Sequence, residues 1–347
     1  MIEKTERLIR VISSNFFKLE IQGLIISVNA LSISLDTQIP NSNLWIQRKG
    51  SAKSHFLKIL SKSNSDYFVR LPDKFFETSI LEDFDSEWFK DRVWVHDDLI
   101  ILFHGLTSKQ RQQLMGFFTE FLSSGIYERR DRSKERVKRV EGRISCIFPI
   151  SQENYSRYGK ELFYQTLTPE RLIPIGFDFS AEDMRVASEI RLIRESENNN
   201  SDNIRLKLPF SNEKVRVKLS REYHRDITDM AMRLQLLIGL SATRGVHYIS
   251  NFLRSHALLN DREEVSREDI EILSLILPAH SEPRESLESE IRRYLFNQLL
   301  KKEEVRSSEI YEKFGDYTDR AVRKALINIR RDCPYKRGEK DEIIFYI

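Results

Sequence analysis

Cysteine is scarce in this chain of 347 residues, which contains only Cys146 and Cys333. The two lie far apart and form no Cys-x-x-Cys pair, so we expect neither a disulfide framework nor a zinc site, and a reducing, cytoplasmic location fits. Long apolar runs are lacking too. The longest, near residues 23–35, is interrupted by four serine and asparagine residues, whereas a membrane-spanning helix needs about 20 apolar residues. We therefore expect no membrane partner.

A strong excess of one charge is also absent. Lys and Arg number 56 against 53 Asp and Glu, for a net charge of +3, so any contact with nucleic acid must come from local basic clusters. The sequence has no Ser-His-Asp array, no metal-spaced His/Cys cluster and no dinucleotide fingerprint, which leaves nucleotide chemistry or binding. The length favours two or three domains.

A candidate phosphate loop is present at residues 47–54, Gln-Arg-Lys-Gly-Ser-Ala-Lys-Ser. It follows the short apolar strand expected at 44–46 and precedes a helix expected at 55–62, which is the context such a loop requires. Backbone N–H groups would cradle phosphate, Lys53 would reach the β- and γ-phosphates, and Ser54 would hold Mg²⁺. The predicted ATP-binding residues are Gly50, Ser51, Ala52, Lys53 and Ser54. Because Gln47 replaces the usual first glycine, an ordinary helix start is the alternative.

Two acids follow a second predicted strand. Residues 93–98 read Val-Trp-Val-His-Asp-Asp, and ligands of open α/β sheets bind beyond the carboxyl ends of the strands. We expect Asp97 to share the Mg²⁺ shell with Ser54. Asp98 would polarise the attacking water, a role more often filled by the longer glutamate. A solvated acidic turn is the alternative, and His96 is expected to be a packed residue.

Strand candidates alternate with helical segments over the first half of the chain, which predicts a mainly parallel sheet covered by helices. The further strands are expected at 67–71, 143–149 and 172–175, and helices at 3–35 and 107–123, the second ended by Gly125. Segments 204–208 and 215–219 alternate apolar and basic residues, which indicates a β-hairpin or two edge strands. Residues 221–277 are expected to be mostly helical.

The segment from Gly50 to Lys58 resembles the phosphate loop of minichromosome maintenance (MCM) helicases, where Ala also precedes the Lys. Residues 241–270 look like the lid of MCM and magnesium-chelatase-like AAA+ ATPases. The resemblance implies an α/β fold with a P-loop AAA+ core, in which Arg244 is the sensor-2 residue facing the nucleotide. Arg171, ahead of a strand, would be an arginine finger that completes a neighbour's ATP site in a ring of identical chains. A surface arginine is the alternative for each, and the polar sensor-1 group would be Ser151 or Asn154.

A strongly basic stretch follows Gly125, at the position where MCM-like ATPases carry a β-hairpin that grips DNA backbone. Lys and Arg bind phosphates without reading sequence. The predicted DNA contacts there are Arg129, Arg130, Arg132, Lys134, Arg136, Lys138 and Arg139. A solvated charged loop is the alternative.

The C-terminal segment predicts a winged helix-turn-helix, with helices at 287–300, 307–314 and 318–331, a wing tip at 335–340 and a closing strand at 343–347. The third helix would enter a major groove, although such modules also bind proteins. The predicted DNA contacts are Arg320, Arg323, Lys324, Lys336 and Arg337.

These observations predict three domains: an ATPase core at 1–180 with N-terminal helices, a lid at 181–280 with a β-hairpin insertion and a helical bundle, and a winged helix at 286–347. We expect an AAA+ protein that binds and hydrolyses ATP with Mg²⁺ and acts on DNA as a homo-oligomer, in the cytoplasm or associated with the nucleoid. It would be an MCM-like helicase, a loader or a remodeller. The alternative is a nucleotide-binding DNA-binding or scaffold protein that does not hydrolyse ATP.

Overall fold

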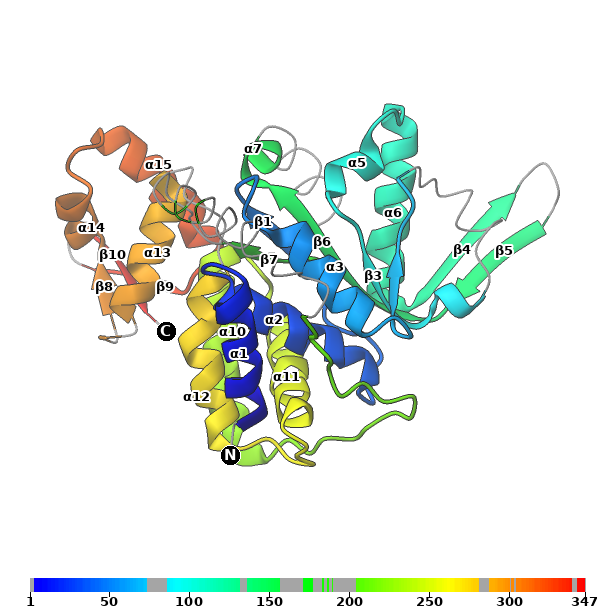
Figure 1. The fold of residues 1–347 in the computed structure, drawn as a ribbon. Helices are drawn as coiled ribbons and strands as arrows, with labels where there is room; N and C mark the ends of the chain where they lie inside the picture. Colours follow the sequence, from blue (N-terminus) through cyan, green and yellow to red (C-terminus); the bar gives the residue numbers. More distant parts are fainter. Residues whose placement is uncertain are drawn as a thin grey trace.

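A five-stranded parallel sheet lies at the centre of the fold in the computed structural model (Figure 1). The structure describes residues 3–73, 86–131, 136–156, 171–176, 183, 186, 189, 204–280, 287–299, 301–302, 304–338 and 342–346. The strands are β1 (Asn43–Gln47), β2 (Phe68–Arg70), β3 (Lys90–Val95), β6 (Arg143–Ser151) and β7 (Ile173–Gly176), in the order β2-β3-β6-β1-β7. All neighbours run parallel. The predicted parallel sheet is confirmed.

Helices cover both faces of this sheet. Successive side chains of a strand point to opposite faces, and β1 shows this: Leu44 and Ile46 belong to one apolar cluster and Trp45 to another. The first cluster contains the buried side chains of α5 (Leu99–Phe103) and α6 (Ser108–Ser124). The second contains those of α3 (Lys53–Ser63) and of the N-terminal and lid helices. Gly125, with φ +70°, ends α6 as predicted.

The single N-terminal helix predicted over 3–35 is wrong. The structure has α1 (Glu3–Asn15), a turn, α2 (Glu20–Ala30) and the short 3-10 helix η1 (Leu31–Ser34). Lys18 in the turn has φ +52°, a left-handed conformation that a right-handed helix cannot contain. The apolar spacing does not reveal the break, because both helices bury an apolar face in the same core.

The β-hairpin or two edge strands predicted from residues 204–219 are also wrong: the described segment forms no strand, only isolated bridges at Val215 and Lys218. This segment, which we call the strap, is extended, but no strand pairing between its two halves occurs in the described chain. Its backbone is bonded to three other elements instead. Leu208 N donates to the Asn64 side chain (2.9 Å), Val215 N to Ser34 O (2.8 Å) and Lys218 N to Glu263 O (2.8 Å). Buried and exposed side chains therefore alternate along residues 204–219 because an extended segment lies against the rest of the protein, not because it pairs as a strand.

The lid is helical, as predicted for residues 221–277. It comprises the short η5 (Arg221–Tyr223), then α10 (His224–Ile238), α11 (Ala242–Leu259), α12 (Arg267–Ile276) and η6 (Leu277–Ala279). A Cβ at Gly245 would lie 3.0 Å from Ala231 Cβ, so α11 and α10 approach closely there. None of the described helices is both long and apolar enough to cross a membrane.

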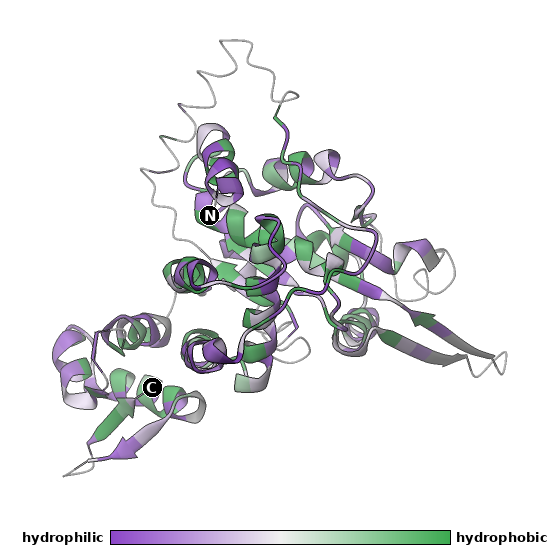
Figure 2. Ribbon diagram, turned by 90° about the horizontal axis from the view of Figure 1, so that it is seen from below, coloured by the Kyte–Doolittle hydropathy of each residue, from purple (hydrophilic) through white to green (hydrophobic). Residues whose placement is uncertain are grey.

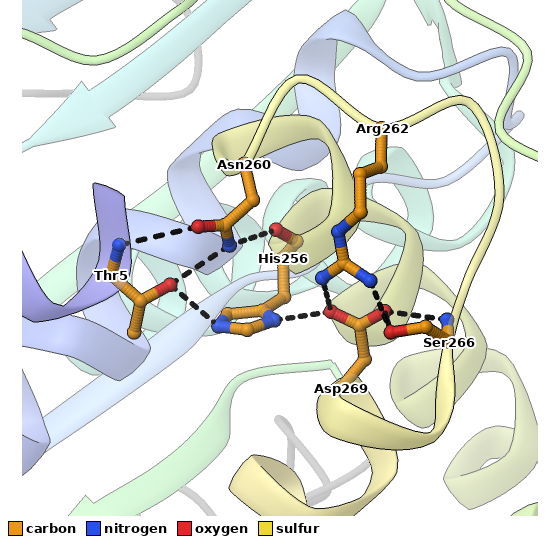
Figure 3. A network of polar contacts seen from close by, with 6 residues as sticks. All are labelled: Thr5, His256, Asn260, Arg262, Ser266 and Asp269. Atoms are coloured by element: carbon orange, nitrogen blue, oxygen red, sulfur yellow. Dashed lines mark hydrogen bonds and ion pairs between the residues drawn. The ribbon is translucent and has the colours of Figure 1, made fainter. Parts of the chain in front are cut away.

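One buried polar network joins the lid to α1 (Figure 3). Asp269 accepts hydrogen bonds from His256 Nδ1 (2.5 Å), Arg262 Nη2 (2.5 Å) and Ser266 N (2.7 Å). The other imidazole nitrogen of His256 lies 2.8 Å from Thr5 Oγ1. Helix α1 is thereby tied to the loop and helices that form the far end of the lid.

A second network joins the lid to the start of β1. The Tyr248 hydroxyl donates to His280 Nε2 (2.7 Å) and accepts from Asn29 (2.8 Å), whose amide also donates to Asn43 (2.9 Å). Burial lowers the pKa of His280 to about 4, against two backbone hydrogen bonds that raise it. His280 is therefore neutral at pH 7, with Nε2 as the acceptor.

A β-hairpin projects from the body on the side away from the C-terminal unit (Figures 1 and 2). Its strands are β4 (Ile126–Asp131) and β5 (Arg136–Glu141), paired from Ile126–Glu141 to Asp131–Arg136. The hairpin root is tightly packed. Gly142 N donates to Gly125 O (2.9 Å), and a Cβ at Gly142 would lie 2.1 Å from Phe89 O.

Gly142→Ala is expected to lower the free energy of unfolding by at least about 2–3 kcal/mol, because the backbone at Phe89 or at the hairpin root must move. Gly116→Ala is the matched control: it lies within α6, and a Cβ there meets nothing within 4 Å. That change should raise stability by about 0.5–1 kcal/mol. Chemical denaturation of both variants checks the pair, and equal stability of the two would contradict the packing described.

The C-terminal unit contains α13 (Leu287–Leu299), α14 (Ser307–Lys313) and α15 (Asp319–Asp332). A three-stranded antiparallel sheet accompanies them, with β8 (Glu304–Arg306), β9 (Tyr335–Arg337) and β10 (Ile343–Tyr346) in the order β8-β10-β9. Thr318 caps α15 by accepting from Ala321 N. The unit packs on the lid, where Arg292 donates to Leu236 O at the end of α10 (3.0 Å).

Candidate functional site

The predicted phosphate loop connects β1 to α3. Gly50 has φ +80° and Ala52 has φ +62°, and the left-handed conformation costs a non-glycine residue about 1–2 kcal/mol. Helix α3 begins directly afterwards at Lys53. Its first backbone N–H groups have no intrahelical acceptor, as at every helix start, and they attract anions. The loop therefore adopts a strained turn that presents a helix N-terminus.

Lys53 is folded into this loop. Its Nζ donates to Gln47 O (2.8 Å), to Arg48 O (2.9 Å) and to Ser51 Oγ (3.3 Å), and the side chain is buried. Burial lowers the pKa of Lys53 to about 8, and the charges of Asp98 and Glu153 oppose that shift. At pH 7 the loop thus encloses an ammonium ion whose direct partners are all neutral oxygens.

Gln47, which replaces the usual first glycine, is fully buried at the end of β1. Neither its amide nitrogen nor its amide oxygen has a hydrogen-bond partner in the described chain. Buried polar atoms of this kind are rare in folded proteins.

The acidic turn after β3 meets the phosphate loop although β6 separates the two strands in the sheet. Ser54 Oγ donates to the backbone oxygen of Asp97 (3.1 Å). The Asp97 carboxylate pairs instead with Arg70 Nη2 at the end of β2 (2.5 Å). The structure thus brings together the two predicted Mg²⁺ ligands, but the carboxylate itself is turned to Arg70.

Asp98 caps the following helix. Its Oδ1 accepts from Ile100 N (3.1 Å), and its Oδ2 accepts from Asn154 Nδ2 (3.4 Å). Asn154 lies in α7 (Gln152–Asn154), directly after β6. Ser151, the other sensor-1 candidate, caps α7 by accepting from Asn154 N (3.1 Å). Of the two, Asn154 is the residue that reaches the acids.

His96 is packed, as predicted: it is buried, with Nε2 3.2 Å from Asp73 Oδ1. The sequence did not single out Arg70 or Glu153. Both lie at the carboxyl edge of the sheet, Arg70 as the last residue of β2 and Glu153 two residues after β6. The signal for both is a charged residue at or just after the carboxyl end of a predicted strand.

The two predicted catalytic arginines take different positions relative to the loop. Arg171 precedes β7, whose Ile173 pairs with the first residue of β1, so it lies at the sheet edge opposite the phosphate loop. Arg244 is half-buried in the first turn of α11. Later in that helix Asn251 donates to Ile39 O ahead of β1 (2.9 Å), so the first turn points toward the loop edge. Among the described residues, no hydrogen bond or ion pair joins Arg244 to Asp97 or Asp98.

The hairpin carries part of the predicted DNA contacts. Arg132 and Lys134 lie outside the described residues, and for Arg129, Arg130, Arg136 and Lys138 only the backbone is described. Register places Arg129 opposite Lys138. Arg139 is exposed and pairs with Glu128 and Glu141, both at 3.1 Å. Its charge is therefore compensated within the hairpin.

The C-terminal unit exposes the other predicted contacts. Arg320, Arg323 and Lys324 are exposed on α15, whereas Val322 and Leu326 of the same helix are buried. Lys336 on β9 is exposed and forms an ion pair with Glu304, and Arg337 beside it is exposed. Arg330 lies over the Tyr335 ring, 5.1 Å from its centroid.

No protein-family model matches the chain, and no curated protein is significantly similar to it in sequence. Within the part of the chain that the structure describes, no three His, Cys, Asp or Glu side chains gather as a metal site. This does not bear on Mg²⁺, which is usually held by one or two carboxylates together with substrate phosphates.

Proposed function

We propose that this chain is a P-loop ATPase of the AAA+ kind that binds ATP with Mg²⁺, hydrolyses it and acts on DNA. One observation carries the proposal. The ends of β1, β6 and β3 bring Lys53, Ser54, Asn154 and Asp98 to one edge of a parallel sheet. That edge is where ligands of open α/β folds bind.

The loop suits a phosphate chain. The ammonium of Lys53 is bonded only to neutral oxygens, so an anion would be its natural partner. The start of α3 adds backbone N–H donors, and the amide of Gln47 adds a donor that has no partner among the described residues. The residues proposed to hold the phosphates are Gly50, Ser51, Ala52, Lys53 and Ser54. Binding requires the Lys53 side chain to exchange its loop oxygens for phosphate oxygens.

The metal would lie between the loop and the acidic turn. The Ser54 hydroxyl and the Asp97 carboxylate are hard oxygen ligands, which Mg²⁺ prefers. The Asp97 carboxylate must turn away from Arg70 to reach it. Mg²⁺ would neutralise charge on the phosphates during transfer.

Asp98 is the proposed water-polarising residue, and Asn154 the polar group that orients the reacting phosphate. The insertion of β6 between β1 and β3 supports this pairing, because it places Asn154 between the loop and the acids. The engagement of Asp98 as a helix cap favours the second candidate function, a nucleotide-binding DNA-binding or scaffold protein that does not hydrolyse ATP.

Oligomerisation is part of the proposal. Arg171 lies at the edge of the sheet away from the phosphate loop of its own chain, so it would act on the ATP site of a neighbouring copy. Arg244 would act in its own chain when the lid closes. Both roles place a positive charge near the transferring phosphoryl group, where it stabilises the transition state.

DNA would contact two surfaces. The projecting hairpin β4–β5 and the C-terminal unit, which contains α15, lie on opposite sides of the body (Figures 1 and 2). The C-terminal unit has the helices and the three-stranded antiparallel sheet expected of a winged helix. Its α15 would enter the major groove through Arg320, Arg323 and Lys324, with Lys336 and Arg337 at the backbone.

Phosphate release from ATP, measured with and without duplex DNA, tests the proposal on the wild type, Asp98→Asn and Asp66→Asn. Asparagine caps a helix about as well as aspartate, so Asp98→Asn should keep the fold and ATP binding. It should lower turnover by about 10²-fold or more, as loss of a positioned acid–base group does. The exposed Asp66 is the matched control. ATP binding without turnover in the wild type would favour the scaffold, and no ATP binding would contradict both functions.

A further inference from the structure

The strap carries an alternating row of basic residues that the site described above does not use. Residues 204–219 contain five Lys or Arg and one acid, Glu213. Leu206, Leu208 and Val217 are buried, whereas the basic residues between and beside them are exposed. Those exposed cations are Arg205, Lys207, Arg216 and Lys218. Alternate residues of an extended chain lie about 6.6–6.8 Å apart, so Arg205 and Lys207 form one spaced pair of charges on the strap, and Arg216 and Lys218 form a second.

The backbone of the strap is held at several points. Leu206 N donates to Ser63 Oγ (3.0 Å), and Asn64 Nδ2 donates to Leu206 O (2.8 Å). Farther along, Asp36 N donates to Val215 O (3.0 Å), and Val265 N donates to Lys218 O (3.0 Å). The row of charges is thus presented on a fixed backbone, so little ordering entropy is lost when a ligand binds.

The four exposed cations have no acidic partner. Arg205, Lys207, Arg216 and Lys218 form no ion pair within the described chain, although Glu263 lies beside Lys218 in the backbone pairing. Burial and the nearby charge of Arg216 lower the pKa of Arg254, against the opposing charge of Asp36. Positive charge is therefore concentrated around the strap, and a bound polyanion would reduce the repulsion among these charges.

The strap also leads away from the root of the hairpin. Lys214 forms an ion pair with Asp91, which pairs with Arg143 (3.3 Å), the first residue after the hairpin and its glycine. From there the strap continues along the lower edge of the molecule toward the loop before α12 (Figure 1). DNA that is bound at the hairpin and extends past its root would therefore contact the basic residues of the strap.

We propose that the strap is a second DNA contact surface, on which Arg205, Lys207, Arg216 and Lys218 bind phosphodiester groups without reading the bases. This inference extends the DNA-binding part of the proposed function and is independent of the ATP site. The charged residues of this surface are cations, and two rings beside it, Tyr67 and Phe210, stack on each other with their centroids 4.5 Å apart. Its ligand is therefore a nucleic-acid backbone, single-stranded or duplex.

The test is fluorescence anisotropy of labelled DNA at several salt concentrations, with one single-stranded and one duplex probe of equal length. The strap variant changes Arg205, Lys207, Arg216 and Lys218 to glutamine. The matched control changes four exposed cations elsewhere, Arg7, Arg10, Lys109 and Arg225, to glutamine. Both full-length proteins lose the same net charge, so the comparison separates local contact from general attraction. Equal melting temperatures exclude unfolding.

The strap variant should bind at least about tenfold more weakly at low salt, and the slope of log K against log salt should become shallower by about 1 for each phosphate that the variant no longer binds. The probe whose affinity changes more shows whether the strap binds single-stranded or duplex DNA. The control should keep the wild-type slope. Equal behaviour of the two variants, or a wild type that binds neither probe, overturns the inference. Since the DNA is titrated without nucleotide, failure of ATP binding or hydrolysis leaves this result unaffected.

Discussion

Replacement of Lys53 by alanine is expected to lower ATP turnover by at least about 10²–10³-fold, the loss in turnover seen when one preorganised donor is removed from a reacting charge, and to weaken ATP binding because the loop loses its ammonium. Lys53 is the one buried cation of the phosphate loop, and its ammonium already lies among the loop oxygens Gln47 O and Arg48 O. No other side chain of the loop places a positive charge inside it, since Arg48 and Lys49 are exposed.

Lys58→Ala is the matched control for this change. Lys58 lies in the same helix α3 but is exposed, so its removal should leave turnover and binding unchanged. Removing the Lys53 ammonium also leaves buried carbonyl groups without a donor, at about 1–3 kcal/mol each. Thermal melting must therefore accompany the turnover assay and an equilibrium-dialysis measurement of bound ATP. A folded Lys53→Ala protein that binds ATP like the wild type would contradict the assignment of the loop.

The pKa of Lys53 adds a pH dependence to the same prediction. Burial lowers it from 10.5 to about 8, so the unfolded chain holds more protons between pH 8 and 10.5, and this group's contribution to stability rises with pH in that window. ATP affinity should change in the opposite direction. Above about pH 8 the free loop loses the charge that attracts phosphate, and affinity should fall by up to about tenfold per pH unit. Lys58→Ala should follow the wild-type curve.

Asp269→Ala is expected to lower the free energy of unfolding by about 3–5 kcal/mol, because breaking a buried ion pair leaves its partners unpaired. The carboxylate is fully buried and accepts from His256 and Arg262, each at 2.5 Å (Figure 3). Without it, the imidazole N–H and the guanidinium face a cavity, and His256, which contacts Thr5 of α1, loses the acceptor that orients its ring. Denaturant unfolding measures the change.

Two further variants make this prediction specific. Asp226→Ala removes an exposed partner of Arg267 (2.8 Å) from the same bundle and should change stability by less than about 1 kcal/mol. Asp269→Asn keeps an acceptor for Ser266 N but loses the charge. Its loss of unfolding free energy should therefore lie between those of Asp269→Ala and Asp226→Ala. If Asp269→Ala were no less stable than Asp226→Ala, the network would have no role in holding the lid.

Acid should weaken the same network. Burial alone would raise the pKa of Asp269, but the hydrogen bonds from His256 and Ser266 N and the charges of His256 and Arg262 hold it below its usual value. A depressed carboxyl pKa contributes stability that is fully present above the unfolded value near 3.8 and is lost as pH falls through the folded value. The Asp269→Ala protein should lack this acid-induced loss.

The sequence predicted the parts of the site that depend on local pattern. The strand that leads into Gln47 and the acids Asp97 and Asp98 were placed correctly relative to their elements, and the helix predicted at 55–62 is present but begins two residues earlier, at Lys53. Each signal is short-range: a run of apolar residues, a glycine in the loop, and acids at the end of a strand. Strand order was beyond such signals, because parallel pairing is decided by contacts far apart in the sequence.

Long-range contacts also decided what the sequence could not predict. Asn154 reaches Asp98 only because β6 lies between β1 and β3. The strap alternates like a strand, yet its backbone bonds to α3, η1 and the loop before α12. The break at Lys18 is hidden because both flanking helices bury an apolar face. In each case the local pattern is compatible with two arrangements, and the tertiary partner selects one.

Calorimetric titration of ATP with Mg²⁺ into the full-length protein tests most directly whether residues 47–54 bind ATP. We expect saturable binding with one site per chain, weakened when Mg²⁺ is withheld because Ser54 and Asp97 would then hold no metal. If the wild-type protein gave no saturable heat with ATP at any Mg²⁺ concentration, these residues would not form an ATP site.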